Sequence, residues 1–264
     1  MADLAPLNHR HHDTLRLHAL LRDASARRDE GAIVLEGPRI VADALDRGVA
    51  LDSVYLGPGA RRAFAALVAR LEAASVLVRD LKEGVLEKIG TTRTPQPVLG
   101  LAPMPTPCAL ADVPAGLLVV ALDVADPGNL GTIVRSAEGA GAVAVVVAGG
   151  VDPWNPKVVR GSAGSIFGVP IIALHDAGVA IAALRAVGWR AVGADAVGSV
   201  SYSEADLTGS VALVLGSEAH GIPDHIASAL DLMVAIPMAG AIESLNVAVA
   251  ASVLLFEAAR QAQS

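Results

Sequence analysis

Residues 117–141 read LLVVALDVADPGNLGTIVRSAEGAG and predict, in this order, a strand, a turn and a helix. The six apolar residues at 117–122 have the length of a strand, and an unbroken apolar run is typical of a strand buried on both faces. Residues 126–128 are a turn signal. Asn129 belongs to the residue types that cap helices, so we expect a helix near 130–141.

The same alternation continues to the end of the chain. Further apolar runs occur at 143–148, 170–174, 190–194, 211–215 and 232–236, with helical segments near 156–164, 177–188, 223–230 and 245–262. Strands that alternate with helices predict an α/β domain whose parallel sheet is covered on both sides. Ligands of such sheets bind beyond the carboxyl ends of the strands, which is where a site is expected.

A proline-rich stretch precedes this region. Residues 102–116 read APMPTPCALADVPAG, which suits an extended linker. Shorter segments come before it, with helices predicted at 9–29, 38–47, 60–73 and 80–89 and strands at 32–35, 53–56, 76–78 and 98–101. We therefore expect a small α/β domain over 1–101, a linker over 102–116 and a larger α/β domain over 117–264.

Composition excludes several classes of protein. Hydrophobic residues make up 53% of the 264 residues, which supplies a core and argues against disorder. The apolar runs have strand length, whereas a membrane-spanning helix needs about 20 apolar residues. No charged segment followed by an apolar one opens the chain, and the single Cys108 excludes an internal disulfide or a cysteine-cluster zinc site. We expect a soluble cytoplasmic protein without a membrane partner or a bound metal.

The formal net charge of −7 argues at first against a nucleic-acid partner. The charge is unevenly divided, however. Residues 1–105 hold 14 basic and 13 acidic side chains, while residues 106–264 hold 6 and 14. The two parts therefore differ in electrostatic character, which weakens the argument against a nucleic-acid partner.

Three polar loops follow predicted strands. The first holds Asn129 and Arg135, the second holds Glu218 between two glycines, and the third runs from Gly240 to Asn246 before an apolar helix. Each loop alone is also compatible with an ordinary turn, a helix cap or the start of a core helix. The glycine spacing matches neither the dinucleotide fingerprint nor a serine-hydrolase elbow, and no Walker lysine follows.

Together the three loops resemble the motifs of a known family. DPGNLGTIVRSA at 126–137, LGSEAHGIP at 215–223 and IPMAGAIESLNVAVA at 236–250 are similar to the SpoU (TrmH-like) RNA ribose 2′-O-methyltransferases, in the SPOUT class of S-adenosylmethionine enzymes. The segment NPKVVRGSAGSIFGVPI at 155–171 resembles the family's stretch between motifs one and two. Two departures are Ser217, where the family commonly has Asn, and His220 at a variable position.

The N-terminal part resembles a substrate-binding domain. LEGPRIVADAL at 35–45 and TTRTPQPVLGLA at 91–102 are similar to the L30e-like domain that several of these enzymes carry. The resemblance implies an RNA substrate, 23S ribosomal RNA foremost and tRNA as an alternative. The arginines expected to contact RNA are Arg27, Arg28, Arg39 and Arg93, each of which could equally be a solvated surface charge.

The resemblance also implies how the catalytic domain is built. The C-terminal segment should form a deep trefoil knot, and a homodimer should form through the helix 245–262. S-adenosylmethionine should be held largely by backbone groups of the loops after strands 211–215 and 232–236. By position, the expected cofactor-binding residues are Leu215, Gly216, Ile236, Met238, Ser244 and Leu245.

The reaction implied is methyl transfer to a ribose 2′-hydroxyl. Arg135 is expected to stabilise the developing oxyanion or to grip the adjacent phosphate, because a guanidinium hardly acts as a base. Asn129 and Asn246 should bind the substrate or orient Arg135. Glu218 should pair with Arg135 or with a group of the partner chain, and Ser244 should line the methyl site.

Two other functions remain open from the sequence. One is an inactive relative that binds RNA or assists ribosome assembly, against which the intact motif residues argue. The other is an unrelated Rossmann-type enzyme acting on a small molecule, against which the missing fingerprint glycines argue.

Overall fold

The computed structural model describes residues 5–91, 94–196 and 198–263, and these residues form two compact units. The first unit comprises the chain up to Pro105 together with Trp154–Phe167, and the second comprises the rest. We had expected residues 154–167 in the second domain. They pack in the first unit because α8 (Pro156–Gly161) lies against β1 (Ala32–Glu36).

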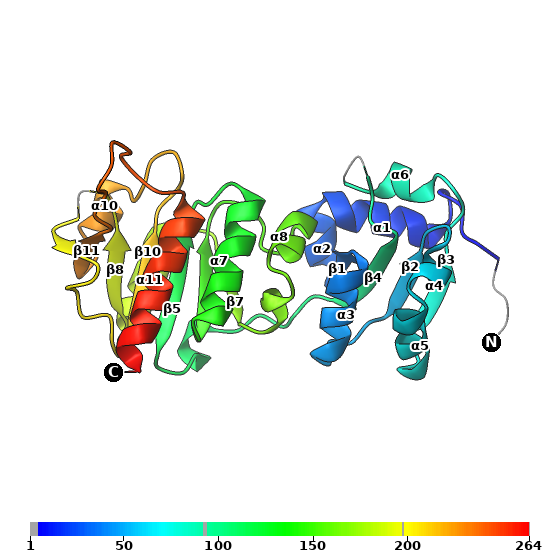
Figure 1. Ribbon diagram of the computed structural model, residues 1–264, viewed down its shortest axis with the longest axis horizontal. Coiled ribbons are helices and arrows are strands. Elements are labelled where there is room, and N and C mark those ends of the chain that lie inside the picture. The colour runs from blue at the N-terminus through cyan, green and yellow to red at the C-terminus, as the bar shows by residue number, and fades with distance from the viewer. Residues whose placement is uncertain (1–4, 92–93, 197, 264) are drawn as a thin grey trace. The chain divides into compact units, whose positions relative to one another are not determined.

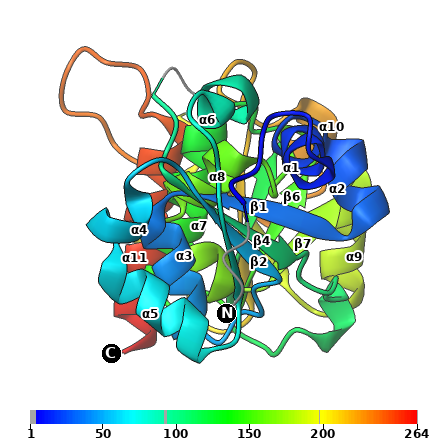
Figure 2. The same cartoon turned by 90° about the vertical axis from the view of Figure 1, so that its right-hand side faces the viewer.

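The first unit is built on a four-stranded mixed sheet with the order β1-β4-β2-β3. β4 (Val98–Pro103) pairs antiparallel with β1 and with β2 (Ser53–Leu56), while β3 (Leu77–Asp80) runs parallel to β2. Figure 2 shows helices on both sides of this sheet. The helices are α1 (His12–Arg22), α2 (Ala24–Glu30), α3 (Pro38–Asp46), α4 (Ala60–Ala63), α5 (Ala65–Ala73) and α6 (Val85–Ile89).

The second unit holds a seven-stranded parallel sheet with the order β7-β6-β5-β10-β8-β11-β9. Its strands are β5 (Leu117–Leu122), β6 (Ala144–Ala148), β7 (Ile171–Leu174), β8 (Arg190–Ala194), β9 (Val200–Ser201), β10 (Val211–Leu215) and β11 (Leu232–Ala235). β10 inserts between β5 and β8, so it is paired on both sides and all five of its residues are buried. The predicted α/β class with a parallel sheet is confirmed.

Helices cover both faces of this sheet. α7 (Pro127–Gly139) and α11 (Val247–Ala262) pack together on one face, in front of the sheet in Figure 1. α9 (Ala177–Ala186) and α10 (Asp224–Ala227) pack together, and α9 contacts β6, β7 and β8. Leu118, Leu130 and Ile133 are fully buried between these layers. Each such side chain stabilises the fold by roughly 1.5–3 kcal/mol relative to an exposed one.

Several predicted boundaries differ from the observed ones. The predicted helix over 80–89 begins only at Val85, because residues 77–80 continue the strand that pairs with β2. The predicted linker contains a short 3-10 helix, η1 (Leu110–Asp112), and Leu110 and Val113 are buried in the core of the second unit. A second 3-10 turn, η2 (Ser165–Phe167), follows α8, and β9 was not expected. Within the described residues, no helix has the length and apolar character that crossing a membrane requires.

Candidate active site

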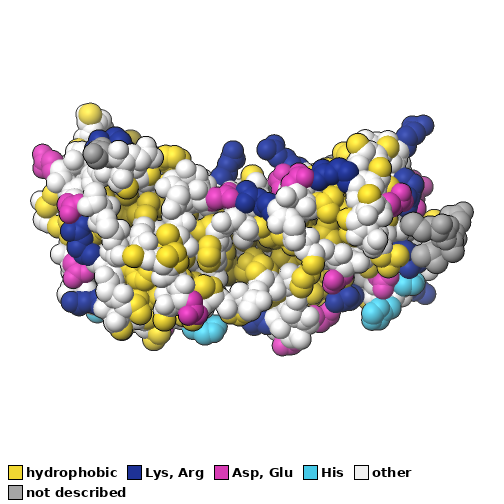
Figure 3. All heavy atoms as spheres, turned by 90° about the horizontal axis from the view of Figure 1, so that it is seen from below, with side chains coloured by type: hydrophobic (Ala, Val, Ile, Leu, Met, Phe, Trp, Pro, Cys, Tyr) yellow, Lys and Arg dark blue, Asp and Glu magenta, His cyan; other side chains and the backbone are white. Residues whose placement is uncertain are grey.

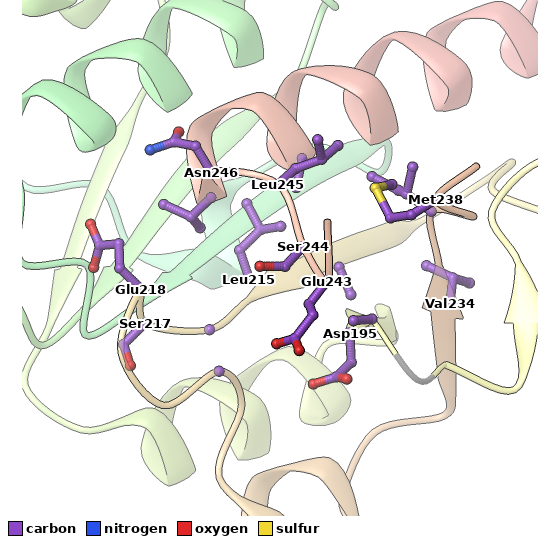
Figure 4. Close-up of a pocket in the computed structure, with 17 residues that line it drawn as sticks. Asp195, Leu215, Ser217, Glu218, Val234, Met238, Glu243, Ser244, Leu245 and Asn246 are labelled. Carbon is purple, nitrogen blue, oxygen red and sulfur yellow. The ribbon is translucent and has the colours of Figure 1, made fainter. Parts of the chain in front are cut away.

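A pocket of about 440 Å³ lies at the carboxyl edge of the parallel sheet. Its wall comes from residues 194–196 at the end of β8, residues 215–221 at the end of β10 and in the turn that follows, residues 234–238 around the end of β11, and residues 243–250 before and at the start of α11. In Figure 4, Ser244 and Leu215 lie at its centre, with Asn246 and Glu218 on one side and Met238 on the other. The volume is within the range of small-molecule and cofactor sites, about 300–1,000 Å³.

The turn after β10 is a tight hairpin that requires both of its glycines. Ser217 and Gly221 exchange two backbone hydrogen bonds of 3.1 and 3.0 Å, and Gly221 has a left-handed φ of +62°. A Cβ on Gly216 would overlap the backbone of Gly221. The Ser217 hydroxyl accepts a 3.2 Å bond from the backbone N–H of His220, which gives this serine a structural contact inside the turn.

A chain of side-chain hydrogen bonds joins the three motifs. Asn246 Nδ2 donates to Asn129 Oδ1 at 3.0 Å, and Asn129 Nδ2 donates to Glu218 Oε1 at 2.8 Å. The Glu218 carboxylate also accepts from the backbone N–H groups of Ala125 and Asp126, at 3.2 and 3.3 Å. Each amide therefore has a fixed orientation, because reversing either one would put like groups face to face.

Helix caps hold both asparagines in place. The cap of α7 is Asp126, whose Oδ1 accepts from the N–H groups of Gly128 and Asn129, so the expected capping role of Asn129 is wrong. Since Asp126 caps the helix, the Asn129 side chain is available to bridge the other two motifs. Asn246 does cap α11, with its Oδ1 accepting from the backbone of residues 248 and 249.

These contacts lower the pKa of Glu218. Partial burial acts in the opposite direction, but the Asn129 amide and the backbone N–H groups of residues 218, 125 and 126 together outweigh it. Donors directed at a carboxylate favour its charged form. Glu218 is therefore an ionised acceptor at neutral pH, and it holds the loop before α7 against the hairpin after β10.

The structure gathers most of the predicted site residues and leaves one outside. All six predicted cofactor-binding residues line the pocket, as do Glu218, Ser244 and Asn246, while Asn129 is bonded to two of these residues. Arg135 is exposed on α7 and is not part of the pocket wall. Within the described residues, Glu218 bonds to Asn129 and two backbone groups instead of the expected Arg135.

The predicted RNA-contacting arginines divide into three cases. Arg27 is wrong as an RNA contact: it is only 2% exposed, and its Nη1 donates to the Leu20 carbonyl at 2.6 Å. Arg28 and Arg39 are exposed. Arg93 lies outside the described residues.

The pocket also contains residues that we did not select from the sequence. Asp195 and Glu243 contribute carboxylates, and Figure 4 shows both on the same side of the pocket. Asp195 directly follows the strand 190–194, so the rule that ligands bind beyond strand ends would have found it. The described lining residues include three carboxylates and no Lys, Arg or His, which favours a cationic ligand over a phosphate.

The fold and the site define a two-unit α/β protein with a cofactor-sized pocket at the carboxyl edge of a parallel sheet. Residues 116–256 match the SpoU rRNA Methylase family, and residues 14–100 match the MRM3-like substrate binding domain. The chain belongs to the SpoU rRNA methylase family. This confirms the resemblance read from the three motifs and the expectation of an N-terminal substrate-binding domain.

Relatives and solved structures agree with this membership. The chain is 36% identical over 177 residues to a Bacillus subtilis 23S rRNA (guanosine(2553)-2′-O)-methyltransferase, covering 67% of this chain and 70% of the relative. The AviRb SpoU methyltransferase of Streptomyces viridochromogenes, solved in complex with the cofactor AdoMet, superposes with a TM-score of 0.83 at 30% identity, covering 96% and 98% of the two chains. An AdoMet-bound rRNA methyltransferase from Sinorhizobium meliloti superposes with a TM-score of 0.79 at 33% identity, covering 93% of each.

Proposed function

We propose that this chain transfers the methyl group of S-adenosylmethionine (AdoMet) to a ribose 2′-hydroxyl of RNA, and that the RNA is 23S ribosomal RNA. The observation that carries the proposal is the hydrogen-bond chain Asn246–Asn129–Glu218, which joins the three family motifs beside the pocket. Relatives over most of the chain are named as 23S rRNA 2′-O-methyltransferases.

The pocket suits AdoMet in size and in charge. Leu215, Ile236, Met238 and Leu245 give it an apolar wall, and the absence of a Cβ at Gly216 keeps the hairpin close to the strand end. AdoMet supplies an activated methyl group on a sulfonium cation. The carboxylates of the wall favour a cation, and the described lining residues offer no basic group for the pyrophosphate of a nicotinamide cofactor.

The chain's own residues position the acceptor and stabilise charge. Arg135 would stabilise negative charge developing on the 2′-oxygen, or grip the adjacent phosphate, with bidentate geometry available. The side-chain amides of Asn129 and Asn246 would also hydrogen-bond the substrate. Glu218 would hold Asn129 in the productive orientation, and Ser244 would line the space through which the methyl group passes.

The first unit favours ribosomal RNA over tRNA. Two rRNA methyltransferase structures from Sinorhizobium meliloti cover 97% and 93% of this chain, so they include a counterpart of the first unit. A structure concerned with methylation of C/U34 on tRNA covers 55% of this chain, with a TM-score of 0.51. The additional unit would select the larger RNA.

Three further features belong to this proposal. A homodimer would form through α11, whose Val249 and Phe256 side chains are 48% and 52% exposed. The segment that leads from β11 into α11 would pass through the predicted trefoil knot, which stays a prediction. The protein would act in the cytoplasm, where its RNA is found.

A labelling experiment tests the proposed function. Purified protein is incubated with AdoMet carrying a radioactive methyl group and with transcribed 23S rRNA or tRNA, and 2′-O-methyl positions are mapped. We expect label on one nucleotide of the 23S rRNA. Label on tRNA alone would overturn the choice of RNA, and AdoMet binding without transfer to either would favour the inactive relative. Mapping total RNA from cells with and without the gene identifies the nucleotide.

A further inference from the structure

Residues 154–167 belong to the methylase match in sequence but to the first unit in space. Val158 and Val159 of α8 are fully buried, and Gly164 lies against Asp43 so closely that an added Cβ would be 3.0 Å from its Cβ. The segment adds two basic residues and no acidic one. The first unit therefore holds 16 basic and 13 acidic side chains, and the second holds 4 and 14.

One of these two basic residues contacts a buried carboxylate. Glu36, the last residue of β1, has a side chain that is 0% exposed, and its Oε2 accepts from Arg160 Nη1 at 2.7 Å. Thr91 Oγ1 donates to the same oxygen at 3.0 Å. Within the described residues, the other oxygen, Oε1, has no hydrogen-bond partner. Burying a carboxylate is costly without a partner, and Arg160 is the cationic partner that the structure gives Glu36.

The contact brings together three stretches that are far apart in sequence. Glu36 belongs to the stretch 35–45, Thr91 to the stretch 91–102, and Arg160 to the segment after β6. Gln96 lies over Gly37, with its Cγ at ordinary contact distance, 3.6 Å, from the place of an added Cβ, and the φ of +131° at Gly37 favours glycine. The two N-terminal stretches that resemble a substrate-binding domain therefore meet at the ion pair of Glu36 and Arg160.

This ion pair fixes the direction of Arg160 without burying it. The Arg160 side chain is 36% exposed, and Glu36 engages Nη1 of a group that has five N–H donors. A guanidinium already held in place loses less conformational entropy on binding than a free one. Arg28 and Arg39 are exposed, and within the described chain no carboxylate orients them. On the face drawn in Figure 3, basic and acidic side chains are interspersed.

We propose that Arg160 binds a phosphate of the RNA substrate and that Glu36 is the residue that positions it. The inference rests on the proposed function, because it requires an RNA substrate. Arginine suits a phosphate because two of its N–H groups can bond two phosphate oxygens at once. Arg160 is therefore added to the residues proposed to contact RNA, whereas the buried Arg27 is removed from them.

RNA binding by the full-length protein tests the proposal. Fluorescently labelled fragments that tile a 23S rRNA are titrated at several salt concentrations with wild type, Arg160→Gln, Arg160→Lys and Glu36→Gln. We expect Arg160→Gln to weaken binding about threefold to tenfold and to reduce the salt slope by about 0.7–0.9, the change for one phosphate contact. Arg160→Lys should restore the salt slope more fully than the affinity. AdoMet affinity should be unchanged in every variant.

Glu36→Gln separates positioning from simple charge. Removal of a negative charge should by itself strengthen RNA binding, whereas loss of the positioning contact should weaken it about twofold to fivefold. Tighter binding by Glu36→Gln would overturn the role of Glu36. The control is Arg70→Gln, which removes an exposed arginine paired with Asp46 in the same unit and should change affinity less.

The single variant Arg160→Gln leaves a buried carboxylate unpaired, so the double variant Glu36→Gln with Arg160→Gln is measured beside it. The double variant carries no uncompensated charge and should fold with wild-type AdoMet affinity and weakened RNA binding. Wild-type RNA affinity and salt slope in a folded double variant would overturn the inference. If the wild type itself binds none of the fragments, the proposed function fails instead.

Discussion

The side-chain amide of Asn246 donates a 3.0 Å hydrogen bond to the side-chain oxygen of Asn129, 117 residues earlier in the chain. Both residues also serve their own helices or loops: Asn246 caps α11, and Asn129 bonds Glu218. The bond makes the start of α11 and the start of α7 parts of one site. Substitutions of Asn246 and Asn129 should therefore change activity and stability to different extents.

The pair Asn246→Asp and Asn246→Ala separates capping from bonding to Asn129. Aspartate keeps the cap but has no N–H for Asn129, which cannot reverse its amide without losing Glu218. We expect Asn246→Asp to keep near wild-type thermal stability and lower turnover roughly tenfold or more through misplacement. Asn246→Ala should in addition lower the free energy of unfolding by about 0.5–2 kcal/mol. Wild-type turnover in the aspartate variant would show that the bond to Asn129 has no role in activity.

Glu218 predicts a dependence of stability on pH. Its pKa is lower in the folded protein than its ordinary value near 4.5, so its stabilising contribution is complete above that value and is lost as the pH falls through the folded pKa. Glu218→Gln cannot titrate. The difference in Tm between wild type and Glu218→Gln should be constant at neutral pH and shrink below about 4.5. A difference that is independent of pH down to 3 would contradict the role of the charged carboxylate.

Gly216→Ala should damage the pocket because the new Cβ would overlap the backbone of Gly221, which cannot rotate away as a side chain can. We expect a loss of about 1–3 kcal/mol in unfolding free energy and weakened AdoMet binding by calorimetry. The matched control is Gly240→Ala, whose Cβ would meet nothing within 4 Å. Equal AdoMet affinity in the two variants would show that the hairpin does not shape the cofactor site.

Arg135→Ala should abolish most of the turnover without affecting AdoMet affinity, because Arg135 does not line the pocket. The loss expected for one group that stabilises an oxyanion is roughly 10²–10³-fold. Arg135→Lys keeps the charge but not the planar donor pair, so it should recover only part of the rate. Turnover near wild type in Arg135→Ala would remove this residue from the mechanism.

Val249→Glu tests the proposed homodimer. A charge placed on the exposed apolar side of α11 would be desolvated in an interface, so the dimer dissociation constant should rise roughly tenfold or more, with a matching loss of turnover. Val179→Glu is the control, because Val179 is 57% exposed on α9 of the same unit. Sedimentation that shows an active wild-type monomer would exclude the interface.

The elements of the second unit could be predicted closely because their signals are local. Apolar runs located β5, β6, β7, β8, β10 and β11 to within about a residue, since strands of a sheet that is covered on both faces are largely apolar; Arg190, the first residue of β8, is an exception. β9 has only two residues and no such run, and it exists because β11 offers an edge to pair with. Asp126 and Asn129 are both good capping residues, so only the backbone geometry decided between them.

The sequence by itself determined the strand and helix alternation, the three motifs and the membership of the family that they indicate. It also placed the cofactor-sized pocket at the loops after two named strands, because ligands bind at the carboxyl ends of parallel strands. Only the tertiary structure decided that Asn246 bonds Asn129, that Arg27 is buried against Leu20, and that Arg160 contacts Glu36. These contacts depend on strand order and packing between distant segments, and a local pattern of residues carries no information about which distant groups will meet.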